Sequence, residues 1–305
     1  MISRTRRVWL FVVLSRPHFL LGGFALFGLG AAIARYLGNE VDAGMYVYGQ
    51  ALVTFGQLMT HYLNEYYDGP ADSQNPRRTP FSGGSGAIGP GLLSRRTAQS
   101  AAIICLAIMG ILASARLIRG DVPLVAWLLF LLLLFGAFFY NAPPLRLVSS
   151  GYGELTAALT VGGIVPSFAF VLQTGQLHRI LFMSTAPLIA LCFAMLITFE
   201  LPDYYTDARF GKSNLLVRIG WQNAMRLHDL AILFAILSYI LAYISGFPMR
   251  VALGAAIVVP LALAQIWQMG RLRAGFKPHW RTLTMVGLGL FSLAAYIELV
   301  GFLLS

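Results

Sequence analysis

The chain has 305 residues, of which 58% are hydrophobic and only 11% are charged, and its mean hydropathy is +0.72. A soluble domain of this length could not bury so much apolar surface, so the composition excludes a soluble enzyme and predicts a polytopic membrane protein. The formal net charge is +10. Membrane topology explains this charge, as shown below, so we expect no nucleic-acid partner.

Apolar runs long enough to cross a bilayer follow one another along the chain. They cover residues 18–38, 46–67, 97–117, 122–140, 152–173, 180–200, 224–245, 249–270 and 282–303. Because a spanning helix needs about 20 apolar residues, the sequence predicts an all-α protein with nine transmembrane helices in a single domain, 1–305. Arg4 to Leu14, basic and then apolar, precedes them without a small-residue cleavage site, which favours an interfacial amphipathic helix over a signal peptide.

The basic residues are divided unevenly between the two predicted ends of these helices. One end carries the N-terminus and the loops after the second, fourth, sixth and eighth runs, and 17 of the 22 Lys and Arg residues lie there. The other five are Arg35, Arg116, Arg119, Arg179 and Arg250. Since cytoplasmic loops are rich in Lys and Arg, we expect a protein of the cell (inner) membrane with its N-terminus inside and its C-terminus outside.

The end of the second run carries the first cluster of polar residues. Asn64, Asp68 and Asp72 are spaced by four, so they share one face while the backbone is helical. We expect Gly69-Pro70 to loosen or end this helix and to leave Asp72 on the exit turn. Grouped oxygen ligands suit Mg²⁺, which is often shared with phosphate. Arg77-Arg78 and a Gly-Ser-rich loop follow, and such groups bind anions, so this segment has the composition of a metal–diphosphate site.

A second acidic cluster, at the end of the sixth run, repeats the first. The offsets are the same in both: Glu65, Asp68 and Asp72 in the first cluster, and Glu200, Asp203 and Asp207 in the second. Lys212 follows the second cluster as arginines follow the first. The chain therefore looks like two related halves, about 16–146 and 147–278, with a last helix at 282–303. Because ligand sites lie between such halves in known membrane proteins, we expect both clusters to face one ligand.

Together these motifs resemble those of the UbiA superfamily of intramembrane prenyltransferases. The resemblance is carried by Asn64-x3-Asp68-x3-Asp72 with Arg77-Arg78, Asp203-x3-Asp207 with Gly211-Lys212, Arg16-Pro17, the segment Tyr140 to Arg146, and Gly151 to Glu154. It covers nearly the whole chain. The stretch from Gly211 to Gly220, and the Gly-Gly-Ser-Gly within Thr79 to Gly86, look most like the dihydroxynaphthoate polyprenyltransferases of menaquinone synthesis.

The resemblance implies an Mg²⁺-dependent enzyme that transfers a polyprenyl group from its diphosphate to an aromatic acceptor. The implied acceptor is 1,4-dihydroxy-2-naphthoate, with 4-hydroxybenzoate, homogentisate or another aromatic compound as alternatives. The implied metal ligands are Asn64, Asp68, Asp72, Asp203 and Asp207. The implied diphosphate-binding residues are Asn64, Arg77, Arg78, Lys212 and Arg146. The four aspartates and Tyr140 would be catalytic, with Tyr140 facing the developing allylic cation.

Two other activities fit parts of this pattern. A CDP-alcohol phosphotransferase also uses clustered aspartates at a membrane face, but its Asp-Gly-x-x-Ala-Arg pattern is absent, because Asp68-Gly69 leads to Pro70-Ala71-Asp72. A cation transporter would use acidic residues in repeats. Here the acids lie at one membrane face beside arginines, and we expect the middle of the helices to lack ionisable residues. His61, one turn before Glu65, is interpreted as a packed or interfacial histidine.

Overall fold

The computed structural model describes residues 3–305 and, of Pro70, only the backbone. The described part of the chain is built of helices, and its only β-structure is an isolated bridge between Ile88 and Leu93. The elements in chain order are α1 (Arg4–Leu14), α2 (Pro17–Tyr36), α3 (Ala43–Asp72), α4 (Arg95–Arg119), α5 (Leu124–Phe139), the 3₁₀ turn η1 (Leu147–Ser149), α6 (Gly153–Ala158), the π-helical segment η2 (Leu159–Ile164), α7 (Val165–Thr174), α8 (Arg179–Glu200), the 3₁₀ turn η3 (Leu201–Asp203), α9 (Tyr204–Arg209), α10 (Leu215–Ile219), α11 (Trp221–Ile244), α12 (Met249–Ala256), α13 (Val259–Arg273) and α14 (Trp280–Leu303).

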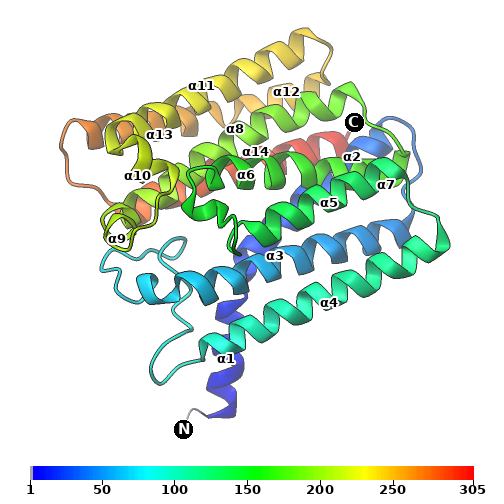
Figure 1. The fold of residues 1–305 in the computed structure, drawn as a ribbon. Helices are drawn as coiled ribbons and strands as arrows, with labels where there is room; N and C mark the ends of the chain where they lie inside the picture. Colours follow the sequence, from blue (N-terminus) through cyan, green and yellow to red (C-terminus); the bar gives the residue numbers. More distant parts are fainter. Residues whose placement is uncertain (1–2) are drawn as a thin grey trace.

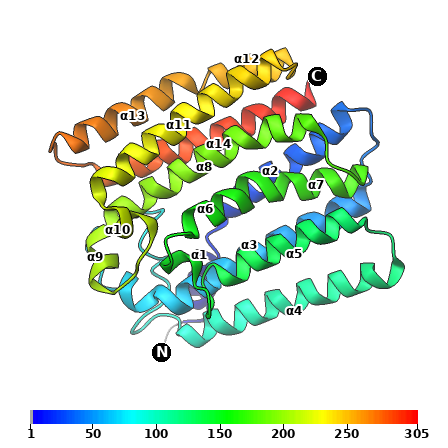
Figure 2. The same ribbon diagram turned by 45° about the horizontal axis from the view of Figure 1, so that its top comes forward.

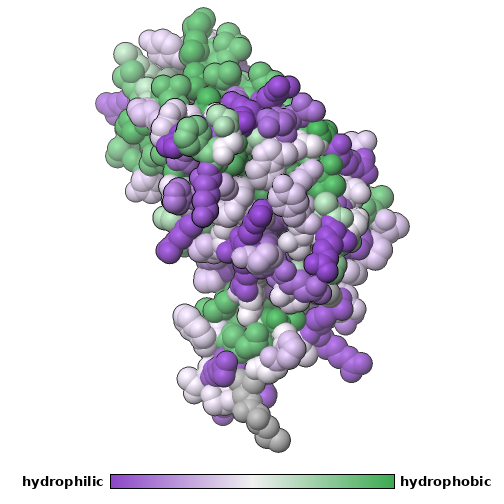
Figure 3. All heavy atoms as spheres, turned by 90° about the vertical axis from the view of Figure 1, so that its left-hand side faces the viewer, coloured by the Kyte–Doolittle hydropathy of each residue, from purple (hydrophilic) through white to green (hydrophobic). Residues whose placement is uncertain are grey.

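The long helices form one bundle of roughly parallel and antiparallel neighbours. Helices α4 and α13 lie at opposite edges, with α2 and α7 between them (Figures 1 and 2). The short helices α9 and α10 lie at one end of the bundle, and the C-terminus lies at the other (Figure 1). Hydrophilic side chains gather over the end that carries α9 and α10 (Figure 3). The bundle therefore has one strongly polar end, as the sequence predicts.

Seven helical segments of the described residues are long and apolar enough to cross a membrane. They are Pro17–Tyr36, Arg95–Arg119, Gly153–Thr174, Arg179–Arg209, Trp221–Ile244, Met249–Arg273 and Trp280–Leu303. Helix α3 is not among these segments. Helix α5 is apolar but has 16 residues, fewer than the 18 taken as the minimum for crossing a membrane. The chain is thus an all-helical, multi-pass membrane protein, and each of the predicted apolar runs falls on helical segments of the described part.

Two predicted runs are interrupted rather than continuous. In the run 152–173, the π-helical segment η2 separates α6 from α7, because Pro166 has no N–H to donate to the carbonyl group four residues earlier. A Cβ built on Gly162 in this segment would lie 2.9 Å from the backbone nitrogen of Ile189, so η2 approaches α8 closely. In the run 249–270, α12 ends before Pro260, and α13 begins beside that proline.

Helix α3 differs from the prediction at Gly69-Pro70. The helix continues through both residues and ends at Asp72, so the expected loosening does not occur. Proline deprives the Tyr66 carbonyl of its helical N–H donor. The guanidinium group of Arg95 replaces that donor, with its Nε atom 2.8 Å from the carbonyl oxygen. Asp72 is still the last helical residue, and Asn64, Asp68 and Asp72 therefore remain on one continuous helix.

The centre of the bundle is held together by close contact between α2 and α7. A Cβ built on Gly30 would lie 2.0 Å from the carbonyl oxygen of Pro166, so only glycine permits this approach. Small residues allow such contacts between helices in a bilayer, where dispersion forces replace the hydrophobic effect. Around this contact, Phe27, Phe168 and Leu188 are fully or almost fully buried. This packing fixes the helices whose polar ends build the site.

Candidate active site

A cavity of about 320 Å³ opens near the polar end of the bundle. Its polar lining includes Asn64, Asp68, Asp72, Asp203 and Lys212. Its apolar lining extends along the bundle to side chains of several helices, namely Leu26, Val53, Leu133, Val165, Met195 and Phe291. A ligand with a charged head and a long apolar tail matches this division of the lining.

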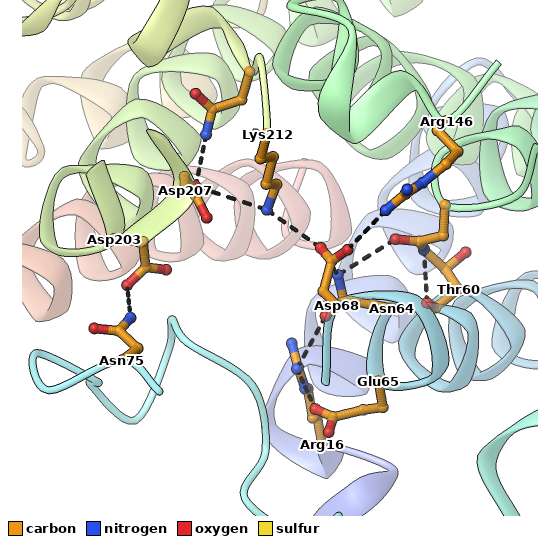
Figure 4. Close-up of polar contacts among 12 residues, drawn as sticks. Arg16, Thr60, Asn64, Glu65, Asp68, Asn75, Arg146, Asp203, Asp207 and Lys212 are labelled. Carbon is orange, nitrogen blue, oxygen red and sulfur yellow. Dashed lines mark hydrogen bonds and ion pairs between the residues drawn. The ribbon is translucent and has the colours of Figure 1, made fainter. Parts of the chain in front are cut away.

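The two acidic clusters face each other across the mouth of this cavity (Figure 4). Lys212 lies between them, with its Nζ atom 3.3 Å from Asp68 Oδ2 and 3.7 Å from Asp207 Oδ2. Asp68 and Asp207 are both buried, at 7% and 6% exposure. The site therefore joins the end of α3 to the α8–α9 region, as the sequence predicts, and a single lysine bridges the two.

Basic groups neutralise the buried aspartates. Burial lowers the pKa of Lys212, but Asp68 and Asp207 outweigh this effect and hold its pKa well above the ordinary value. Arg146, whose φ of 41° lies in the left-handed region, places its Nη2 atom 3.3 Å from Asp68 Oδ1. The Arg146 guanidinium also lies over the Tyr67 ring at 5.6 Å. Lys212 and Arg146 are therefore placed to meet negative charge at the cavity mouth.

The second cluster is held mainly by neutral donors. Asn75 Nδ2 donates to Asp203 Oδ1 at 2.6 Å, and Ser82 Oγ donates to the same oxygen at 3.4 Å. Both donors belong to the loop after α3, so this loop ties the first cluster to the second. Asn214 Nδ2 donates to Asp207 Oδ2 at 2.8 Å. Asn214 also caps α10, since its Oδ1 accepts from Val217 N.

Asp72 is the least satisfied of the four aspartates. Its carboxyl group forms no hydrogen bond or ion pair within the described residues, although it lines the cavity. Burial raises the pKa of this carboxyl to about 7, and Lys212 opposes that rise. A Cβ built on Gly84 would lie 2.6 Å from Asp72 Oδ2, and Gly84 has a φ of 78°. The Gly-Ser-rich loop therefore passes directly against Asp72, which requires glycine there.

Asn64 belongs to a hydrogen-bond network that reaches the turn after α5 and the residue before α2. Asn141 is fully buried and donates from Nδ2 to the Thr60 carbonyl at 3.0 Å, which turns its Oδ1 toward Asn64. Asn64 Nδ2 accordingly donates to Asn141 and to Asp68, while its Oδ1 accepts from Arg16 at 3.2 Å. In this arrangement Asn64 orients Asp68. Asn64 Oδ1 has a second lone pair, which could ligate a metal ion while Arg16 stays in place.

Arg77 and Arg78 do not line the cavity. The Arg77 guanidinium lies over the Tyr205 ring at 5.1 Å, and its side chain is exposed. Arg78 Nε donates to the Gly84 carbonyl at 3.1 Å, and its side chain packs against Gly86. Both arginines therefore shape the loop after α3 in this structure, and the structure does not bring either of them to the aspartates.

Several residues of the site were not singled out as site residues from the sequence. Arg16 lines the cavity and pairs with Glu65, at 2.5 Å, and its place just before α2 was visible only as part of a motif. Glu200 lines the cavity beside Tyr140 and lies against the carboxyl of Glu154. Asn75, Ser82, Asn141 and Asn214 carried no signal, because neutral side chains of these types are common in loops and caps.

Two ionisable residues outside the aspartate positions, His61 and Glu298, have defined hydrogen-bond partners. His61 is packed, with its Nδ1 atom 3.1 Å from the Ser15 carbonyl oxygen, and it also lines the cavity. Glu298 is fully buried in the last two turns of α14, outside the middle of that helix. Its carboxyl group is hydrogen-bonded to Ser184 and to Tyr239. Glu298 does not line the cavity at the polar end.

The donor set suits a hard divalent cation. Four carboxyl groups and the Asn64 amide approach one cavity mouth, and oxygen donors are those that Mg²⁺ prefers. Within the described residues, no three His, Cys, Asp or Glu side chains are already grouped closely enough to hold a metal ion by themselves. Because Mg²⁺ commonly completes its coordination with waters and substrate phosphate, these oxygen donors fit a metal ion that is shared with a phosphate group.

Comparison with solved structures identifies the fold. The chain is similar to digeranylgeranylglyceryl phosphate synthase, with a TM-score of 0.66 and 14% identity over 98% of this chain and 99% of that one. It is also similar to a UbiA homologue from Archaeoglobus fulgidus bound to GPP and Mg²⁺, with a TM-score of 0.63 and 15% identity over 97% and 100% of the two chains. A UbiA homologue from Aeropyrum pernix K1 has a TM-score of 0.66 and 16% identity, over 92% and 97%.

Sequence comparison gives the family. Two relatives are named 1,4-dihydroxy-2-naphthoate octaprenyltransferase. The relative from Bacillus subtilis (strain 168) is 26% identical over 230 residues, which are 73% of this chain and 69% of the relative. The relative from Escherichia coli (strain K12) is 27% identical over 240 residues, which are 74% and 73% of the two chains. The profile of the UbiA prenyltransferase family matches residues 21–286, and the chain therefore belongs to that family.

Proposed function

We propose that this protein transfers a polyprenyl group from polyprenyl diphosphate to 1,4-dihydroxy-2-naphthoate, as in menaquinone synthesis. The observation that carries the proposal is the meeting of two aspartate clusters, bridged by Lys212, at the mouth of a cavity with apolar depth. The two relatives named 1,4-dihydroxy-2-naphthoate octaprenyltransferase support the choice of acceptor. Other aromatic acceptors, such as 4-hydroxybenzoate and homogentisate, are the alternatives that the experiment below separates.

The donor would bind with its diphosphate at the polar mouth and its tail in the apolar depth. The C–O bond to the allylic carbon then breaks, and its electron pair passes to the leaving diphosphate. Lys212 and Arg146 would hold the negative charge of that group, since both already lie beside Asp68. Arg77 and Arg78 are the proposed outer contacts of the diphosphate, which requires the loop after α3 to bring them closer.

We propose Mg²⁺ as the cofactor, held by Asp68, Asp72, Asp203 and Asp207 with Asn64 as a further oxygen ligand. When bound, Mg²⁺ supplies Lewis acidity and a template at the diphosphate oxygens. The A. fulgidus homologue bound to GPP and Mg²⁺ supports this choice. The free carboxyl group of Asp72 offers the ligand that needs no existing contact to break.

The acceptor would enter beside Tyr140, which lines the cavity together with Glu200 and Lys212. The face of the Tyr140 ring would stabilise the positive charge on the allylic carbon. The ring carbon of the acceptor forms a bond to that carbon, and the ring then gives up a proton. Because the apolar lining excludes water, the allylic cation reacts with the acceptor instead of being hydrolysed.

A direct assay tests this proposal. Purified protein in lipid nanodiscs is given labelled polyprenyl diphosphate, Mg²⁺ and, in separate reactions, 1,4-dihydroxy-2-naphthoate, 4-hydroxybenzoate or homogentisate. We expect a product that joins one naphthoate ring to one prenyl chain, identified by mass spectrometry, with one diphosphate released. A conjugate with a different acceptor alone would correct the acceptor, whereas no conjugate with any acceptor would refute the proposal.

We also propose nine membrane crossings, in which α3 and α5 complete the set of seven apolar segments. The halves would be residues 16–146 and 147–278, followed by α14, within one domain. The excess of Lys and Arg at the polar end supports an inner-membrane protein with its N-terminus and site in the cytoplasm and its C-terminus outside.

Cysteine labelling tests this orientation. Gln74 and Gln176 are exposed and lie in loops at the two ends, after α3 and after α7. The native Cys105 and Cys192 are buried, so they provide a low background. An impermeant thiol reagent should label Gln176→Cys in intact cells and Gln74→Cys only in inverted vesicles. The reverse pattern would overturn the orientation.

A further inference from the structure

A groove of about 410 Å³ lies between α13 and α14, apart from the catalytic cavity. Arg271, Lys277 and His279 lie in its lining, together with the aromatic rings of Trp267 and Phe276. None of these residues lines the catalytic cavity. The connection between α13 and α14 lies at the same end of the bundle as α9 and α10 (Figure 2). The groove therefore belongs to the polar end but not to the active site.

The chain reversal after α13 holds Arg271 in a fixed place. Gly275 has a φ of 87°, and its N–H donates to the Leu272 carbonyl at 3.1 Å, while Phe276 N–H donates to the Arg271 carbonyl at 3.1 Å. These paired bonds form a Schellman motif, which brings the residue after the glycine back over the last helical turn. The Arg271 guanidinium consequently lies 4.4 Å from the Phe276 ring centroid and 5.2 Å from that of Trp267.

The positive charge of the groove has no acidic counterpart. Between Asp229 and Glu298 the sequence contains no Asp or Glu. Asp229 pairs with Arg273 at 2.5 Å, and Glu298 is buried elsewhere. Within the described residues, Arg271 forms no ion pair and Lys277 has no hydrogen-bond partner for its side chain. Two cations therefore face the groove with their charge available to an anion.

The aromatic residues give the groove an apolar rim. Trp267 is 61% exposed and Phe276 is 54% exposed. Charges that only set membrane topology need no groove and no ring to hold them, since the number of Lys and Arg residues per loop decides orientation. Here a fixed arginine, a free lysine and two exposed rings surround one hollow. This combination matches a ligand with a phosphate group attached to an apolar body.

We infer that this groove binds an anionic membrane phospholipid, with Arg271 and Lys277 contacting the phosphate group. Trp267 and Phe276 would contact the glycerol and the first methylene groups of the acyl chains. His279 lies in the lining and can donate a further hydrogen bond from its ring. Basic pockets between transmembrane helices at the cytoplasmic face are a physical match for lipid headgroups.

Native mass spectrometry of the detergent-purified protein tests this site. The probes are dioleoylphosphatidylglycerol, the zwitterionic dioleoylphosphatidylcholine, and inorganic phosphate alone. Arg271→Gln/Lys277→Gln should weaken phosphatidylglycerol binding about thirtyfold, because two cations near anionic lipid are removed. Arg271→Lys/Lys277→Arg keeps both charges and should retain most of the binding. The matched control Arg4→Gln/Arg6→Gln removes two exposed charges from α1 and should leave this binding unchanged.

Four other results would contradict the binding of an anionic lipid in this groove. Unchanged phosphatidylglycerol binding in the groove variant, or an equal loss in the α1 control, would overturn the proposal. Equal binding of the zwitterionic lipid would show that the cations do not select the headgroup, and would overturn it as well. Groove-dependent binding of inorganic phosphate without any binding of phosphatidylglycerol would assign the groove to a soluble phosphate and refute the lipid.

Discussion

The two acidic clusters have the same sequence offsets but different backbones. The first lies on one continuous helix, because α3 runs through Gly69-Pro70 to Asp72. The second is divided, since α8 ends at Glu200, the 3₁₀ turn η3 contains Pro202 and Asp203, and α9 begins at Tyr204. A proline is thus accommodated in one helix and accompanies a change of helix in the other. The difference shows that equal spacing does not guarantee equal geometry.

The partners of the two clusters also differ. Asp68 has two cations, Lys212 and Arg146, and one asparagine as partners. Asp207 has one cation and one asparagine, whereas Asp203 has only neutral partners within the described residues. The first acidic residue of each cluster is a glutamate, and the two glutamates have different partners. Glu65 pairs with Arg16, whereas Glu200 lies against another carboxyl group, that of Glu154. Glu65 and Asp68 of the first cluster are therefore compensated by basic side chains, whereas Glu200 and Asp203 of the second cluster form no ion pair within the described residues.

Removal of the divalent cation should lower the rate of prenyl transfer more than any single substitution. Both clusters should need the cation, although their partners in the protein differ. If both clusters hold Mg²⁺ against the diphosphate, excess chelator should abolish prenyl transfer and added Mg²⁺ should restore it. The measurement is the rate of conjugate formation in nanodiscs, with Ca²⁺ addition as a control for general ionic effects. Full activity in excess chelator would show that neither cluster acts through a metal ion.

The next largest effect is expected from Asp68→Ala and Asp207→Ala, one from each cluster. Each variant loses one contact that stabilises the leaving group, and such a loss typically costs about 10²–10³ in kcat. The tail lies in the apolar depth, so an uncharged prenyl analogue should bind both variants nearly as well as the original protein. Near-normal turnover in one variant only would show that its cluster is structural. Near-normal turnover in both would refute the assignment of the site.

A sharper comparison uses the leading glutamates, Glu65 and Glu200. Glu65→Gln leaves the mostly buried Arg16 without its counter-ion and should lower the free energy of unfolding by about 3 kcal/mol. Glu200→Gln removes one of two carboxyl groups in contact, so thermal unfolding in detergent should be unchanged or should occur at a higher temperature. Equal destabilisation by the two substitutions would mean that the matching offsets do reflect matching environments.

Much of the fold follows from the sequence because its signals are local. Apolar runs predicted where helices lie, and the four-residue spacing placed Asn64, Asp68 and Asp72 on one face. The meeting of the clusters was predicted from the repetition of their offsets at the ends of two helices. These features depend on hydrophobicity, helical periodicity and charge, each of which is written in consecutive residues.

The rest depends on contacts between distant segments. The donation from Asn75 to Asp203, and the support of the Tyr66 carbonyl by Arg95, join residues whose pairing has no periodic signal. The π-helical segment was missed because Pro166 does not by itself reveal whether a helix ends, kinks or widens. The placing of Arg77 and Arg78 away from the cavity depends on loop geometry, which charge alone does not predict.

Replacement of Arg77 or Arg78 should have the smallest effect on prenyl transfer. It compares the basic residues that follow the first cluster with Lys212, which follows the second. Lys212 lies between the carboxylates, whereas Arg77 contacts Tyr205 and Arg78 contacts the Gly84 carbonyl. Exposed charges contribute about 0.2–1 kcal/mol each, so Arg77→Ala or Arg78→Ala should raise the KM for the prenyl diphosphate about 1.4- to 5-fold and leave kcat nearly unchanged.

Lys212→Met provides the contrast, because it removes a charge at the reacting end and should lower kcat severely. The assay is steady-state kinetics at low and high salt, since a contribution from exposed charges weakens as ionic strength rises. If Arg78→Ala instead lowers kcat as much as Lys212→Met, the loop after α3 must close over the diphosphate during turnover. Arg78 and Lys212 would then both contact the diphosphate during turnover. The different placing of these two residues would be a property of the protein without its substrate.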